Sequence, residues 1–105
     1  EMQKYDEALL YLDKATEESP YNARIYYNYG LLLNQAGEYI LAEQALLNAL
    51  ELDDRNSSFV YALSTFYIER QNKEKALEYA LLLRELNPGE ESVEQFVEQV
   101  KAFNP

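Results

Sequence analysis

The chain has 105 residues, which is enough for one compact domain or a short repeat array. Its 19 acidic and 9 basic residues give a net charge of −10, which disfavours binding to nucleic acids and to anionic membranes. The sequence has no cysteine and no histidine, which excludes disulfides, thiolate nucleophiles and imidazole ligands for zinc. No apolar run approaches the roughly 20 residues that a membrane-spanning helix needs.

Residues 3–18 carry apolar side chains at helical spacing and are predicted to form the first helix. Pro20 ends this segment, because proline disfavours a helical conformation of the residue before it. Asn22 is the predicted N-cap of the next helix.

Residues 23–36 and 38–52 are predicted to be antiparallel neighbours, since the loop between them is very short. Gly37 stops the first of these helices and permits a positive φ there. We expect Gly30 and Ala42 to face each other where the two helices cross, because small side chains allow a close approach. The inward positions are expected at Tyr26, Tyr29, Gly30, Leu33, Tyr39, Ala42, Leu46 and Ala49.

The same pattern returns in residues 57–71 and 73–86, where Gln71-Asn72 replaces Gly37-Glu38 and asparagine can take the left-handed cap. The last segment, 91–103, is predicted to be a capping helix, since one face is apolar and the other is mostly acidic. Its apolar stripe is Val93, Phe96, Val97, Val100 and Phe103. Its outward residues are expected to be Glu91, Glu94, Glu98 and Lys101.

These landmarks recur at a constant interval, as the even spacing of Ala8, Ala42 and Ala76 illustrates. The 34-residue helix-turn-helix unit resembles the tetratricopeptide repeat. The resemblance is carried by Tyr26, Tyr29, Gly30, Leu33, Gly37, Tyr39, Ala42, Leu46 and Ala49, by Val60, Leu63, Ser64, Tyr67, Ala76, Ala80, Leu83 and Pro88, and, for a second helix alone, by Tyr5, Ala8, Leu9, Ala15 and Pro20. It implies an all-α fold of about six helices, a right-handed α-solenoid of antiparallel helix pairs. The chain then divides into a half repeat (1–22), two full repeats (23–56 and 57–90) and a C-terminal capping helix (91–105).

In this family the first helices of successive repeats line a concave groove that takes an extended or helical peptide. Helical spacing predicts the groove residues beside the core stripe. They are Arg24, Tyr27, Asn28, Leu31, Asn34 and Gln35 in the first full repeat, and Ser58, Tyr61, Ala62, Thr65 and Glu69 in the second. Tyr27 and Tyr61 would anchor the peptide with rigid rings. In the alternative interpretation, both tyrosines only pack against a neighbouring helix.

The same resemblance argues against the carboxylate clamp of chaperone-binding members, because Tyr27, Leu31, Tyr61 and Thr65 stand where lysine and asparagine would be needed. The sequence also contains no calcium loop, phosphate loop or nucleophile–base pair. We therefore predict an interaction module rather than an enzyme, with no metal, no cofactor, and a protein or peptide partner of unknown identity.

A second hypothesis is structural. Helix 3–18 lacks the first helix of its own repeat, so Leu9, Leu12 or nearby groups would face solvent unless another chain or an upstream segment covers them. The chain would then be a segment of a longer array, an appended tail of a larger protein cut before Glu1, or a homo-oligomer formed through this helix. We expect a soluble protein, and the sequence leaves its compartment open.

Overall fold

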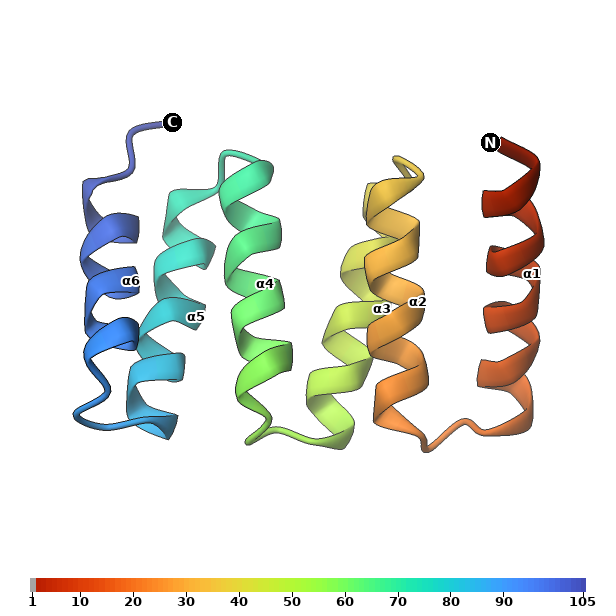
Figure 1. Ribbon diagram of the computed structural model, residues 1–105, viewed down its shortest axis with the longest axis horizontal. Coiled ribbons are helices and arrows are strands. Elements are labelled where there is room, and N and C mark those ends of the chain that lie inside the picture. The colour runs from red at the N-terminus through yellow and green to blue at the C-terminus, as the bar shows by residue number, and fades with distance from the viewer. Residues whose placement is uncertain (1) are drawn as a thin grey trace. The chain divides into compact units, whose positions relative to one another are not determined.

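The computed structural model describes the backbone of residues 2–105 and the side chains of residues 5–105. These residues form six α-helices and no strand (Figure 1). The helices are α1 (Met2–Glu18), α2 (Ala23–Gln35), α3 (Tyr39–Leu52), α4 (Ser57–Glu69), α5 (Lys73–Leu86) and α6 (Glu91–Ala102). The predicted all-α class is confirmed, and each helix lies within two residues of its predicted bounds.

The helices fall into two compact units. The first unit ends at Asp54 and holds α1, α2 and α3, and the second begins at Arg55 and holds α4, α5 and α6. Within each unit, successive helices run antiparallel and lie side by side (Figure 1).

Asparagine side chains cap the N-termini of three helices. The side-chain oxygen of Asn22 accepts a hydrogen bond from the backbone N–H of Ile25, as predicted for an N-cap. Asn56, its counterpart in the next repeat, caps α4 in the same way through the N–H groups of Ser58 and Phe59. The repeat register therefore extends to the residues that start the helices.

The turns inside the two complete helix pairs need one residue with positive φ. Gly37 has φ +83° after α2. In the second pair this residue is Gln71, with φ +62°, and not Asn72, which has φ −104° and caps α5 through Lys75 N–H. The prediction for Asn72 was wrong because Gln71 holds the register position of Gly37. A side chain there strains the backbone.

The crossing of α2 and α3 is close, as predicted. A Cβ atom on Gly30 would lie 2.8 Å from Cγ and Cδ2 of Leu46, so Leu46 provides the nearest atoms to this position. In the second pair, Ser64 replaces Gly30, and Ala80 holds the position of Leu46. The Ser64 hydroxyl is buried and donates a 2.7 Å hydrogen bond to the carbonyl oxygen of Ala76.

The core of each unit contains most of the residues that were predicted to face inward. Leu33, Ala42, Leu46 and Ala49 are buried in the first unit, whereas Tyr26 and Tyr29 are only half-buried. Tyr39 was predicted to face inward and is instead exposed, because it is the first residue of α3 and lies in a shallow surface hollow lined by residues 37–41.

Helix α6 packs on α5 through Val97 and Val100, both buried. Its C-terminal end is held by Lys73, whose Nζ donates to the carbonyl oxygen of Lys101 at 2.6 Å. Of the residues predicted to face outward, Glu94 is half-buried and lies 3.8 Å from the guanidinium group of Arg84.

Candidate functional site

The groove residues predicted in the first unit all lie on α2. Arg24, Asn28 and Gln35 are exposed, and Tyr27, Leu31 and Asn34 are half-buried. The guanidinium carbon of Arg24 lies 5.9 Å from the centre of the Tyr27 ring, within reach of a cation–π interaction. This stripe of α2 is therefore accessible in part, and its role as a binding surface stays a prediction.

The groove residues predicted in the second unit lie on α4. Ser58 and Glu69 are exposed, Tyr61 is half exposed, and the Thr65 hydroxyl donates to the carbonyl oxygen of Ala62 at 3.0 Å. Ala62 itself was predicted to line the groove but is buried. It shares a stripe with Phe59 and Phe66, both buried, so the apolar sector of α4 is wider than the sequence pattern predicted.

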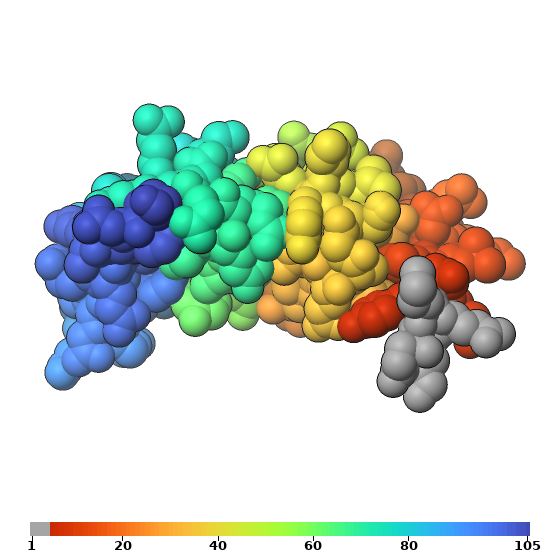
Figure 2. All heavy atoms as spheres, turned by 90° about the horizontal axis from the view of Figure 1, so that it is seen from above, coloured from red at the N-terminus to blue at the C-terminus, as the bar shows by residue number. Residues whose placement is uncertain are grey.

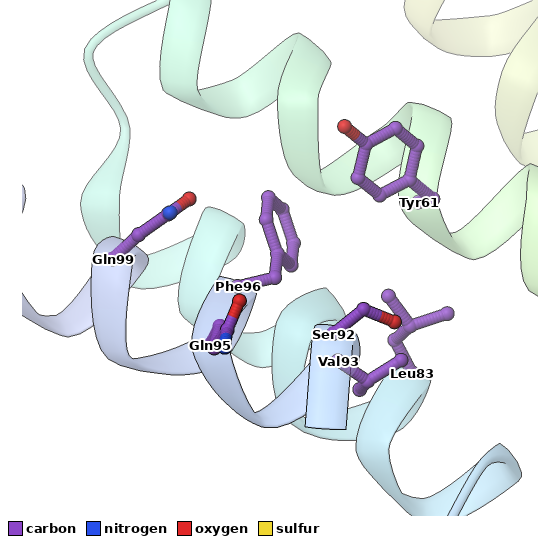
Figure 3. Close-up of a pocket in the computed structure, with 7 residues that line it drawn as sticks. All are labelled: Tyr61, Leu83, Ser92, Val93, Gln95, Phe96 and Gln99. Atoms are coloured by element: carbon purple, nitrogen blue, oxygen red, sulfur yellow. The ribbon is translucent and has the colours of Figure 1, made fainter. Parts of the chain in front are cut away.

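A pocket of about 320 Å³ opens beside Tyr61, within the second unit. Besides Tyr61, it is lined by Leu83 of α5 and by Ser92, Val93, Gln95, Phe96 and Gln99 of α6. Figure 3 shows the Tyr61 and Phe96 side chains approaching each other from α4 and α6. Their ring centres are 5.0 Å apart with the planes tilted by 52°, a favourable aromatic geometry. The two rings therefore form one apolar wall held by two helices.

Most of this pocket was missed by the sequence reasoning, which treated α6 only as a cap. The signal was present in the repeat register. Ser92, Gln95 and Gln99 are the counterparts, one repeat later, of Ser58, Tyr61 and Thr65. Helix α6 thus continues the predicted groove stripe, while Val97 and Val100 on its other face bury against the unit.

The chemistry of the pocket is apolar with uncharged polar groups at its border. Leu83 is buried and Phe96 is half-buried, whereas Ser92, Gln95 and Gln99 are exposed. Glutamine amides offer both hydrogen-bond donors and acceptors, which suits a peptide backbone. Among the residues that the structure describes, no charged side chain lines the pocket, so these residues offer no ion pair to a ligand.

One ionisable side chain in the first unit has a shifted pKa. The Tyr29 hydroxyl of α2 donates a 3.3 Å hydrogen bond to Oδ1 of Asp13 on α1. Burial, and then the neighbouring Asp13 carboxylate, raise the pKa of Tyr29 above its usual value. This hydrogen bond links two helices and lies outside the pocket, so we interpret it as structural. Among the described residues, no cluster of carboxylates could hold a metal ion.

Comparison with known proteins identifies the repeat. Residues 11–44 match the family model described as tetratricopeptide repeat, a window that contains α2. Residues 11–44 are therefore a tetratricopeptide repeat. Among curated protein sequences, none matches it.

Several solved structures share the tetratricopeptide-repeat fold of this chain at low sequence identity. The first TPR of Spaghetti (RPAP3), bound to the HSP90 peptide SRMEEVD, has 20% identity and a TM-score of 0.80, over 96% of this chain and 80% of that one. The TPR domain of Arabidopsis OM64 has 17% identity and a TM-score of 0.79, over 97% and 84%. The Yersinia enterocolitica type III secretion chaperone SycD, in complex with a peptide of the translocator YopD, has 17% identity and a TM-score of 0.77, over 97% and 78%.

These structures confirm the predicted fold class, and the family model confirms the predicted repeat over residues 11–44. They say nothing about which residues of this repeat protein bind a partner, because at such identity they show the fold alone. None of its helices, over the described residues, is both long and apolar enough to cross a membrane.

Proposed function

We propose that this protein is an interaction module that binds a peptide segment of another protein, with one apolar side chain of the peptide seated against the wall formed by Tyr61 and Phe96. The observation that carries the proposal is the pocket of about 320 Å³ in the second unit, which has an aromatic wall and a polar border. Such a combination is typical of sites that bury an apolar anchor and orient it with a few polar groups. The solved structures with bound HSP90 and YopD peptides support the same class of ligand.

The preferred ligand is an uncharged, apolar stretch of peptide rather than a C-terminal carboxylate. None of the described residues that line the pocket is a lysine or an arginine, and Gln95 and Gln99 can hydrogen-bond a peptide backbone without a charge on either partner. The proposal assigns the protein no catalytic role and no cofactor.

The experiment uses a library of random peptides displayed on phage, selected against the whole chain. The affinity of the selected peptides is then measured for Tyr61→Ala, Phe96→Ala and the control Tyr21→Ala, whose ring is 85% exposed in the first unit. We expect each pocket variant to lose about tenfold in affinity, since aromatic anchors dominate binding energy. The control should change little. Circular dichroism confirms that the variants are folded.

Peptides that bind wild type, Tyr61→Ala and Phe96→Ala equally would exclude this pocket. The double variant Tyr27→Ala/Tyr61→Ala extends the test to the α2 stripe. Unchanged affinity in that folded variant would remove the groove hypothesis as a whole.

A second candidate function, extension of a helical stack or self-association, is favoured by a different observation. Tyr11 of α1 is 72% exposed. Apolar side chains so exposed on one helix are typical of a repeat that has an uncovered face. Light scattering that shows a stable monomer at high concentration would count against self-association. The division of the chain into a half repeat, two full repeats and a cap belongs to the same proposal.

A further inference from the structure

One face of α1 is uncovered, whereas the same face of its counterparts in both complete pairs, α3 and α5, is covered. This open face consists of Ala8, Tyr11, Leu12 and Ala15. The residues one repeat later on α3 (Ala42, Ala45, Leu46 and Ala49) are all at most 4% exposed. On α1, Tyr11 is 72% exposed and the other three are half-buried. In Figure 1, α1 has α2 on one side and no helix of its unit on the other, and Figure 2 shows α1 in red at the edge of that unit.

The second pair shows what covers the position of Tyr11. Its counterpart two repeats later is also a tyrosine, Tyr79 of α5. The Tyr79 ring stacks on Tyr67 of α4, with ring centres 5.8 Å apart and planes 14° from parallel. A helix that covers α1 as α4 covers α5 would therefore place an aromatic residue against Tyr11.

The first pair shows what must oppose Leu12. Its counterpart is Leu46, and a Cβ atom on the facing Gly30 would lie only 2.8 Å from the Leu46 side chain. A helix that approaches Leu12 as closely needs a glycine, or another very small residue, at that point. The aromatic and the small residue lie three positions apart on one stripe of the partner helix, as Tyr67 and Ser64 do.

Charge argues for a basic partner and against a second copy of this chain. Glu7, Tyr11 and Glu18 share one border stripe of the open face, at helical spacing, and each chain carries a net charge of −10. In a second copy, α6 is the helix that follows α2 and α4 in the repeat register. There, Glu94, Glu98 and Lys101 stand where Tyr26, Gly30 and Leu33 stand in α2. A glutamate at the crossing point would clash and bury a charge.

We propose that the open face of α1 binds an amphipathic helix of another protein that carries an aromatic residue opposite Tyr11, a small residue opposite Leu12 and basic residues toward its ends. The helix lies antiparallel to α1 and completes a third helix pair. This inference is independent of the peptide pocket, because it uses another helix and another mode of recognition, a helix docked by its apolar stripe.

The test uses a fluorescent, helix-stabilised peptide with the sequence of residues 56–71 and the change Ser64→Gly, because a Cβ atom at this position would clash with Leu12 as one on Gly30 would with Leu46. The peptide keeps Tyr67 as its aromatic residue. Its basic form carries Ser58→Lys and Glu69→Lys, and its acidic form carries Ser58→Glu. Binding to the whole chain is followed by fluorescence anisotropy. Tyr11→Ser is compared with the matched control Leu10→Ser, a neighbouring residue on α1 with nearly the same exposure but on a different face.

We expect the basic peptide to bind, to lose about tenfold or more in affinity with Tyr11→Ser, and to change less than about twofold with Leu10→Ser. The acidic peptide should bind more weakly, and salt should reduce the difference. Phe96→Ala should leave the binding of the basic peptide unchanged, which separates this face from the pocket.

Three results would overturn the proposal. The two α1 variants could bind the basic peptide equally, or Phe96→Ala could abolish its binding, which would place the peptide in the pocket. A chain that sediments as a dimer and dissociates with Tyr11→Ser would assign the open face to a second copy.

Discussion

The contact between Gly30 and Leu46 predicts that Gly30→Ala destabilises the wild-type protein but stabilises the Leu46→Ala variant. In the wild-type protein, the Cβ atom of Gly30→Ala would lie 2.8 Å from two carbons of Leu46 and 3.2 Å from its backbone nitrogen. Such overpacking costs about 2 kcal/mol. Alanine offsets about 1 kcal/mol of this through its higher helix propensity. We therefore expect a net loss of about 1 kcal/mol in the free energy of unfolding.

Leu46→Ala alone leaves a cavity at a buried position and should cost about 3 kcal/mol. In that background the side chain that obstructs the alanine at position 30 is gone. Gly30→Ala should then stabilise the protein by up to about 1 kcal/mol, a coupling between the two sites of about 2 kcal/mol. The second pair already combines the larger residue, Ser64, with the smaller one, Ala80.

The assay is urea unfolding of the four proteins, followed by far-ultraviolet circular dichroism. Because the chain divides into two compact units, native-state amide exchange then shows whether the loss of stability falls on α2 and α3. Equal effects of Gly30→Ala in both backgrounds would refute the reasoning. So would a stabilising effect of Gly30→Ala in the wild type.

Three further predictions concern the turn, a pKa and the core. Gln71→Gly should raise the free energy of unfolding by about 1 kcal/mol, since Gln71 has φ +62°, and a loss of stability on thermal unfolding would contradict it. Because the pKa of Tyr29 is raised in the folded protein, its contribution to the free energy of unfolding is fully present below pH 10.0 and is lost as pH rises through the folded-state pKa. Tyr29→Phe should therefore reduce the decrease in the free energy of unfolding that is measured between about pH 8 and about pH 11. An unchanged alkaline loss would show that Tyr29 is not its source. Ala42→Leu should lower the free energy of unfolding in urea by about 1–3 kcal/mol, because Ala42 is completely buried. An unchanged free energy would mean that the packing of α2 and α3 has room for a larger side chain.

Local features of the chain could be predicted well because they depend on neighbours in sequence. Pro20, Asn22 and Gly37 act through their own backbone geometry or through the first turn of the following helix, and each acts where it was predicted. The prediction for Asn72 failed because it relied on the tolerance of asparagine for positive φ and not on the repeat register, which places this conformation at residue 71. The fold required a positive φ at position 71, and Gln71 adopts it although asparagine tolerates it better.

Contacts between helices were predicted less well. Helical spacing places Gly30 on the inward stripe, but it does not say whether Ala42 or Leu46 provides the nearest atoms, because that depends on how one helix is shifted along the other. Tyr39 fits the inward stripe by spacing and is nevertheless exposed, because it is the first residue of its helix.

The pocket shows the same division between sequence and tertiary structure. Tyr61 was predicted from its place beside the core stripe of α4, whereas Phe96, Gln95 and Gln99 were assigned to a cap. Their common register was visible, but only the packing of α6 on α5 brings Phe96 to 5.0 Å from Tyr61. A sequence motif cannot report a contact between rings that lie on separate helices, more than one repeat apart in the chain.

The sequence alone determined the repeat length, the helices with their caps and turns, and the absence of thiol and imidazole chemistry, since these follow from residue type and from short-range spacing. Tertiary structure decided which small residue meets which large one, which aromatic rings pair, and which face of α1 remains uncovered. These depend on the relative shift and rotation of packed helices, which is set by the summed fit of many side chains and by no single local signal.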